Sequence, residues 1–314
     1  MGTMTHDISA PARLRTGLLL ALLSASSFGL SGALAHGLMS AGWSAAAVVA
    51  VRVLVGGVVL LPLALRQLRG DWDPLRRNAG LICAYGLTAV AGTQLAYFSA
   101  VAHMTVGAAL LIEYTAPIAV VGWLWLSRGQ RPSRATIFGG VLGIAGLVLV
   151  LDLRSGIGAN WVGIAWALAA MLGAAAYFIL SARGGADLPG TVLATGGLLI
   201  GGLTLLAAGA IGIVPLRATT TPIPYAHFTT PLWLPLLALG TITAAISYTT
   251  GIAATRHLGS RLASFIALTE VLAAILFAWL LLAEAPGLIQ FLGGALILTG
   301  LVVVRLGEPE PADA

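Results

Sequence analysis

The chain has 314 residues, of which 59% are apolar and only 9% are charged, against roughly 25% charged in an average soluble domain. The 16 basic and 11 acidic residues cannot cover the surface of a globule of this size, so the composition excludes a water-soluble protein. All basic residues are Arg, and a chain without Lys cannot carry the Walker motif of a nucleotide-driven pump. The single Cys, Cys83, excludes an intrachain disulfide and a Cys-based metal cluster.

Apolar segments of about 20 residues follow one another along the chain and predict ten transmembrane helices in one membrane domain, 1–314. The longest connection, about 214–231, contains several prolines and cannot be helical throughout. The tail at 307–314 is expected to be disordered. The predicted spans are 15–36, 44–65, 78–101, 104–126, 134–152, 159–182, 190–213, 232–254, 259–282 and 286–305.

The Arg residues are distributed unevenly between the two sides that these ten spans define. Two of them, Arg154 and Arg217, fall on one side, and Arg52 lies inside a span. Because basic residues mark the cytoplasmic side, we predict an inner-membrane protein with both termini in the cytoplasm. The basic charge therefore reports topology and predicts no nucleic-acid partner. The residues on the predicted cytoplasmic side are Arg13, Arg15, Arg66, Arg69, Arg76, Arg77, Arg128, Arg131, Arg134, Arg183, Arg256, Arg261 and Arg305.

The sequence repeats itself after a shift of 154 residues. Trp125 then coincides with Trp279, and Gly139 coincides with Gly293. Five helices is an odd number, so the second copy would enter the membrane in the opposite orientation. Inverted repeats are typical of secondary transporters, whose substrate site lies near the midplane between the halves. We expect a first five-helix repeat at 13–157 and a second, inverted repeat at 158–306.

This organisation resembles the EamA-type members of the drug/metabolite transporter superfamily over nearly the whole chain. Segments 270–271, 283–284, 290 and 293–294 are similar to the family pattern E-P-…-G-E-…-Q-…-G-G, with Val271 in place of a frequent Pro. Segments 111–117 (LIEYTAP) and 51–54 (VRVL) resemble helix segments of the threonine/homoserine exporters. The resemblance implies alternating-access export of small metabolites, often amino acids.

Three ionisable residues are predicted to lie deep in the bilayer, where each costs about 2.5–3.5 kcal/mol. They are Arg52, Glu113 and Glu270. Two interpretations stay open for the first two residues. They form a buried structural pair, or Glu113 faces a cavity and binds a substrate ammonium or a coupling proton, while Arg52 tunes it or meets a carboxylate. Glu270 has no obvious buried cation as a partner, and structural and functional roles weigh equally for it.

Polar and aromatic residues inside the spans suit a cavity for amphipathic organic solutes, although each alone also fits packing or an interfacial belt. Gln94 and Tyr97 are three residues apart and share a helix face. Pro117 predicts a break close to Glu113 that would expose backbone carbonyls. Small-residue motifs in the fifth and tenth spans indicate helices that support the bundle. The other candidates for the cavity are Tyr114, Trp166, Tyr177 and Tyr248.

These features predict a secondary transporter in a lipid bilayer that exports small organic metabolites, above all amino acids or related zwitterions, without a metal or a cofactor. Import, or exchange of sugars, nucleotide-linked solutes or drugs, is the alternative within the same class. Segment 29–32 (GLSG) matches a rhomboid protease motif, but a Ser nucleophile needs a nearby base. All five His lie in loops or at span ends, which disfavours an intramembrane enzyme.

Overall fold

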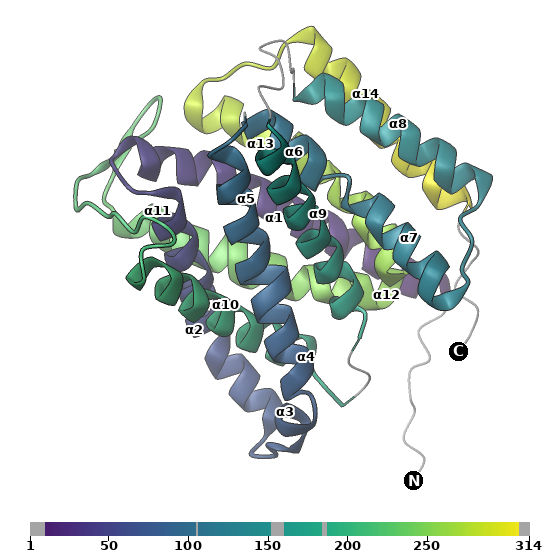
Figure 1. Cartoon of the computed structure of the whole chain (residues 1–314), viewed down its shortest axis with the longest axis horizontal. Coiled ribbons are helices and arrows are strands. Elements are labelled where there is room, and N and C mark those ends of the chain that lie inside the picture. The colour runs from purple at the N-terminus through teal and green to yellow at the C-terminus, as the bar shows by residue number, and fades with distance from the viewer. Residues whose placement is uncertain (1–9, 105, 152–159, 184–186, 308–314) are drawn as a thin grey trace.

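The computed structural model describes residues 10–104, 106–151, 160–183 and 187–307, which form a bundle of helices (Figure 1). Within this part of the chain, 8 helical segments are long and apolar enough to cross a membrane, so the protein is a multi-pass membrane protein. Two further apolar helices, Arg134–Val150 and Thr269–Leu282, are shorter. The tail 308–314, the predicted boundary between repeats at 157–158 and Arg154 lie outside the described residues.

The elements follow one another with short connections. Two segments, η1 and η3, are π-helical, and two short strands lie in the longest connection. The first half contains α1 (Ala10–Ser40), α2 (Ala45–Leu68), α3 (Asp73–Arg77), α4 (Ala79–Ala84), η1 (Tyr85–Gly92), α5 (Thr93–Val101), α6 (Val106–Glu113), α7 (Ala116–Arg128) and α8 (Arg134–Val150). The second contains α9 (Trp161–Ser181), α10 (Gly190–Ala210), β1 (Ile223–Pro224), β2 (Thr229–Thr230), α11 (Trp233–Gly240), η3 (Thr241–Ile246), α12 (Ser247–Ala267), α13 (Thr269–Leu282) and α14 (Leu288–Gly307).

The chain reverses direction inside α12, at Gly259, whose φ of 80° and ψ of 158° are not helical. A positive φ of this kind is available to Gly because it has no Cβ. Before Gly259, Ser247 contacts Ser24 of α1 and Leu258 contacts Gly17, so the chain runs toward the start of α1. After Gly259, Ala273 contacts Gly29, so the chain runs back toward the end of α1. The chain therefore passes α1 in opposite directions before and after Gly259, and the 35-residue segment Trp233–Ala267 contains this reversal.

Helices α8 and α14 lie side by side at one edge of the bundle (Figure 1). The backbone at Gly146 faces the Gly293 carbonyl, and the backbone at Gly139 faces the Gly300 carbonyl, so the two helices are antiparallel. A Cβ on Gly146 would lie 2.5 Å from the Gly293 oxygen, which only a residue without a side chain avoids. The glycines that repeat in the sequence are thus the residues that allow this close contact.

The two π-helical segments repeat with the same shift of 154 residues. At η1, the hydroxyl of Thr93 donates to the Thr88 carbonyl at 3.0 Å. At η3, the hydroxyl of Ser247 donates to the Ile242 carbonyl at 3.0 Å. The wider π turn leaves carbonyls without their regular helical partners. In both halves, the hydroxyl of the residue five positions later donates a hydrogen bond to such a carbonyl. The sequence predicted neither segment.

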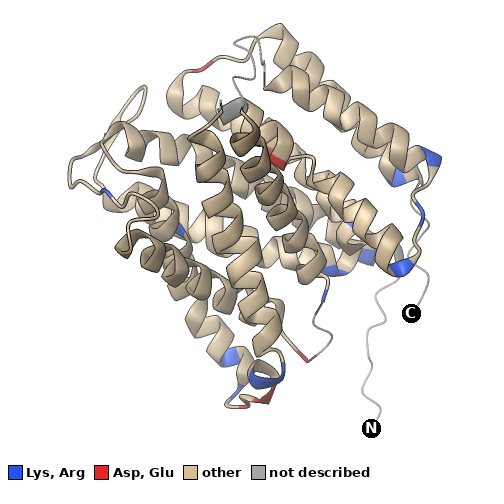
Figure 2. Ribbon diagram, viewed as in Figure 1, with Lys and Arg blue, Asp and Glu red and all other residues tan. Residues whose placement is uncertain are grey.

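The Arg-bearing ends of several helices meet at one side of the molecule. Arg261 Nη2 donates to the Gln130 carbonyl at 3.1 Å, and Arg256 Nη1 donates to the Leu188 carbonyl at 2.8 Å. The last residue of α14, Gly307, lies against the start of α8. Figure 2 shows most basic ribbon segments along the lower and right edges of the view. The Arg-bearing segments that these contacts join therefore lie close together in space.

The long connection between α10 and α11 is non-helical, as predicted, but it also forms an antiparallel pair of short strands. Ile223 pairs with Thr230, and Pro224 pairs with Thr229. Ile223 is fully buried, and the Tyr225 hydroxyl donates to the Leu34 carbonyl of α1 at 3.3 Å. The prolines prevent a helix in this connection. Its polar groups form hydrogen bonds between the two strands and with α1 instead.

Replacing Gly146 by Ala is expected to lower the free energy of unfolding by about 1–3 kcal/mol, because the new methyl group forces α8 away from α14. The matched control is Gly122→Ala in α7, where a Cβ would meet no atom within 4 Å. That variant should keep or raise stability, since Ala is favoured over Gly in a helix by about 0.5–1 kcal/mol. Unfolding in mixed micelles measures both, and an equal response would contradict the close helix contact.

Candidate functional site

Two helices are interrupted at equivalent positions in the two halves. In the first half α6 ends at Glu113, α7 begins at Ala116, and Pro117 occupies the first turn of α7, where the missing N–H leaves no helical bond unmade. In the second half α12 ends at Ala267 and α13 begins at Thr269. A shift of 154 residues carries the end of α6 onto the end of α12. Both breaks interrupt the regular helical backbone, which a membrane protein tolerates beside a cavity.

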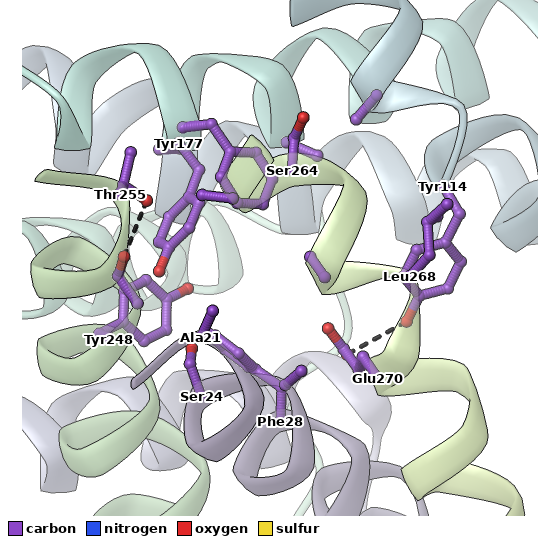
Figure 3. Close-up of a pocket in the computed structure, with 18 of the residues that line it drawn as sticks. Ala21, Ser24, Phe28, Tyr114, Tyr177, Tyr248, Thr255, Ser264, Leu268 and Glu270 are labelled. Carbon is purple, nitrogen blue, oxygen red and sulfur yellow. Dashed lines mark hydrogen bonds between the residues drawn. The ribbon is translucent and has the colours of Figure 1, made fainter. Parts of the chain in front are cut away.

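A cavity of about 170 Å³ lies between these two breaks (Figure 3). Helices α1, α2, α9 and α12 and the segment around η1 and α5 complete its wall, whereas α8 and α14 contribute no residue to it. The supporting role expected for the fifth and tenth spans agrees with this placement. The residues predicted from the sequence that line the cavity are Arg52, Gln94, Glu113, Tyr114, Pro117, Tyr177, Tyr248 and Glu270.

A hydrogen bond across the cavity connects the two breaks. The Tyr114 hydroxyl, from the α6–α7 break, donates to Glu270 Oε1 at 3.1 Å (Figure 3). Glu270 lies in the first turn of α13, where the helix dipole favours a negative charge. One carboxylate oxygen of Glu270 is therefore bound by the protein, and its position depends on the other half of the molecule.

The carboxylate of Glu113 is in a different situation. It lines the same cavity at the C-terminal end of α6. Within the described part of the chain, it makes no hydrogen bond to another side chain, and the one ion pair found there is Arg77–Asp73 at the surface. The interpretation of Arg52 and Glu113 as a directly contacting pair therefore has no support, and the Glu113 carboxylate is available to a solute.

Arg52 is held by the second half of the chain. Its Nε and Nη2 donate to the Thr243 carbonyl of η3 at 3.2 Å and 2.7 Å, and its guanidinium carbon lies 5.3 Å from the centre of the Phe28 ring. Its side chain is only 9% exposed. The π-helical segment η3 thus supplies a carbonyl that accepts from the buried Arg52 guanidinium, and the ring of Phe28 supplies an aromatic face for the same cation.

Aromatic rings form one wall of the cavity. The Tyr177 ring packs against Tyr248 with 5.6 Å between centroids and against Phe178 with 4.9 Å, and Phe28 lies 5.1 Å from Tyr248. Tyr177 and Tyr248 lie on one side of the cavity, opposite Tyr114 (Figure 3). The Tyr177 hydroxyl is buried beside the Ser24 side chain, next to Gly251.

Two predicted residues lie outside the cavity wall. Trp166 precedes Tyr177 by three turns of α9 and is 43% exposed. Tyr97 packs beside a small cluster around Ala100 and Met104 and against Phe98. Helix-face spacing suggested Tyr97, but neither Tyr97 nor Trp166 belongs to the residues that line the cavity.

Several lining residues were not identified as site candidates from the sequence. Ser24 of α1 donates to the Ser247 carbonyl at 2.8 Å and also lines the cavity. Thr93 aligns with Ser247 after the shift of 154 residues, a signal that could have marked it. Phe28 carried no distinguishing pattern among many apolar residues. Further lining residues are Phe178, Thr255 and Ser264.

Comparison with known proteins agrees with this architecture. The sequence profile of the EamA-like transporter family matches residues 15–152 and, a second time, residues 161–306. No curated protein matches the chain. A solved structure, described only as the crystal structure of a protein, is 22% identical and has a TM-score of 0.74, covering 95% of this chain and 98% of its own. At that identity the likeness shows the fold alone.

Replacing Tyr114 by Phe removes the bond between the two breaks and is expected to lower the free energy of unfolding by about 0.6–1.7 kcal/mol, the range for hydrogen bonds between membrane helices. Tyr97→Phe is the matched control, because no hydrogen bond of its hydroxyl is found among the described residues. Unfolding in mixed micelles compares the two variants. Equal stability of Tyr114→Phe and the unmodified protein would show that the bond to Glu270 does not stabilise the bundle.

Proposed function

Because the chain belongs to the EamA-like transporter family and is a multi-pass membrane protein, we propose that it exports amino acids or related zwitterions by alternating access. The family assignment establishes the broader class, a membrane transporter of small solutes. The cavity at the two helix breaks supports the narrower assignment. Its volume of about 170 Å³ is below the roughly 300–1,000 Å³ of pockets for drug-sized ligands and suits a small metabolite.

The proposed topology has ten spans arranged as two inverted halves, 13–157 and 158–306, with both termini in the cytoplasm of a cell with an inner membrane. The reversal at Gly259 supports a division of Trp233–Ala267 between two spans. The antiparallel packing of α8 and α14, which begin 154 residues apart, supports the inversion. The shared location of the Arg-bearing ends supports one cytoplasmic side.

The observation that carries the proposed mechanism is the unpaired Glu113 carboxylate in a cavity between the halves. In this role Glu113 binds the ammonium group of the substrate or, in its absence, a coupling proton. Glu270, anchored by Tyr114, contributes the second carboxylate. Gln94, Tyr177 and Tyr248 provide polar and aromatic contacts. The energy comes from a gradient, since the chain has no Lys for a nucleotide-binding loop.

Alternating access in this arrangement is a movement of one half against the other around a fixed site. The Tyr114–Glu270 bond and the Arg52–Thr243 bonds both connect the halves at the cavity. A solute bound between Glu113 and the aromatic wall contacts residues of both halves at once. Its binding can therefore favour one arrangement of the halves over another, which is the requirement for coupling.

In proteoliposomes with an amino-acid panel, Glu113→Gln is expected to reduce flux of the transported amino acid about ten- to a hundredfold, the loss of a hydrogen bond to a charged group. The pH dependence of the remaining flux should also change, because one of the two carboxylates of the cavity is gone and only Glu270 remains.

The matched control is Glu284→Gln, which removes the same charge from an exposed loop. It should leave flux and its pH dependence unchanged. The assignment of Glu113 fails if its variant keeps both the flux and the pH profile of the unmodified protein. If no amino acid in the panel is transported by the unmodified protein, the proposed substrate class fails instead.

A further inference from the structure

The guanidinium of Arg52 uses only part of its hydrogen-bonding capacity within the protein. An Arg side chain has five N–H donors, one on Nε and two on each of Nη1 and Nη2. Arg52 donates from Nε and from Nη2 to the Thr243 carbonyl, at 3.2 Å and 2.7 Å. Both bonds use the same edge of the planar group. The two N–H groups of Nη1 and the second one of Nη2 have no hydrogen-bond partner among the described residues.

These three donors are open to the cavity. Arg52 lines the cavity, and Nη1 retains accessible surface although the residue as a whole is buried. The Phe28 ring lies 5.3 Å from the guanidinium carbon. An aromatic ring attracts a cation but provides no carbonyl or carboxylate oxygen for its N–H groups. The edge formed by Nη1 and Nη2 is therefore left for an acceptor that enters the cavity.

A carboxylate is the acceptor that fits this edge. No side-chain carboxylate of the described residues lies within ion-pair distance of Arg52, because the one ion pair found among them is at the surface. A buried cation is unfavourable unless negative charge and hydrogen-bond acceptors compensate it. The two oxygens of a carboxylate match the spacing of the guanidinium fork and accept from both nitrogens at once. The count of free donors is the same whether Glu113 and Glu270 are protonated or ionised.

Arg52 is also held in place before a solute arrives. The Thr243 carbonyl of η3 fixes one edge of the guanidinium, and Phe28 of α1 packs against it. A side chain that is already ordered loses little conformational freedom when it binds a ligand. Since Arg52 belongs to the first half of the chain and Thr243 to the second, a carboxylate on the free edge would bind where the two halves are connected.

We propose that Arg52 binds the carboxylate group of the transported solute, with Nη1 and Nη2 donating to its two oxygens. The substrates are then solutes of amino-acid size that carry a carboxylate, and amines without one bind weakly. This inference rests on the proposed function and deepens it, because it names the residue that selects amino acids against other amines.

Two amino acids and their analogues test this on the unmodified protein in nanodiscs. L-leucine and L-threonine are compared with their amides, in which a neutral group replaces the carboxylate. They are also compared with 4-methylpentanoate and 3-hydroxybutanoate, which keep the carboxylate and lack the amino group. Titration calorimetry at neutral pH measures the dissociation constants. The amides should bind about ten- to a hundredfold more weakly than the parent acids, since they lose a hydrogen-bonded ion pair.

Arg52→Lys tests the residue itself, because Lys keeps the positive charge but lacks the fork. It should weaken the binding of the parent acids and of the two deaminated acids by the same factor of about ten, and change amide binding by less than about twofold. The matched control is Arg256→Lys. Arg256 is also a partly buried Arg that donates to backbone carbonyls, those of Ser181 and Leu188, but it does not line the cavity. This control should leave the ratio of acid to amide affinity unchanged.

The outcomes separate this inference from the proposed function. If the amides bind the unmodified protein as tightly as the parent acids, the inference is overturned and amino-acid transport stands. An equal loss of acid and amide affinity in Arg52→Lys would also overturn it. If neither amino acid binds but the deaminated acids bind and depend on Arg52, the proposed substrate class fails and the inference holds. Absence of binding by every carboxylate compound would overturn both.

Discussion

Hydrocarbon offers no hydrogen-bond partner to a backbone carbonyl, an N–H group or a charge, so each polar group within the bundle must find a partner in the protein. The molecule departs from regular helices in the bundle at a few places, and at each one a partner is present. The π-helical turns are completed by Thr93 and Ser247. The carbonyl of Thr243 accepts from Arg52. The two helix breaks lie at the cavity, and the N–H groups of Tyr114, Thr115 and Leu268 donate there to carbonyls of the preceding turn.

Near-symmetry between the halves explains why the breaks meet. The ends of α6 and α12, the two π-helical segments and the starts of α8 and α14 are all related by the same shift along the sequence. The symmetry stops at the residues that carry charge. The shift places Ala267 opposite Glu113 and Ala116 opposite Glu270. Each half therefore supplies one carboxylate to the cavity. Glu113 lies before the break in the first half, and Glu270 lies after the break in the second half.

This asymmetry gives the two carboxylates different environments. Glu270 lies at a helix N-terminus and accepts a hydrogen bond from Tyr114. Glu113 ends a helix and has no such partner among the described side chains. Arg52, held by η3 and lying over Phe28, adds a guanidinium to the same cavity.

Much of this arrangement was accessible from the sequence, because the cost of burying polar groups in a bilayer makes the exceptions conspicuous. Arg52, Glu113, Glu270 and the break near Pro117 were found in this way, and all line the cavity. What the sequence could not supply was the set of partners. The π-helical turns have no composition signal, Phe28 is one apolar residue among many, and the position of Trp166 along α9 depends on the packing of neighbouring helices. Likewise, the acceptor of Arg52 is a backbone carbonyl, which no side-chain pattern reveals.

The central claim is that one site between the two halves is reached in turn from both sides of the membrane. Ala174 lines the cavity without a charged role, so Ala174→Cys, in a protein with Cys83 replaced by Ser, can report access to a membrane-impermeant thiol reagent. Val141→Cys, on the exposed apolar face of α8, is the control and should not react, because a thiolate does not form in hydrocarbon. The account predicts that the Cys at position 174 reacts from either side of sealed vesicles and that a transported amino acid slows both reactions. Reaction from one side alone under every condition, unaffected by the amino acid, would contradict it.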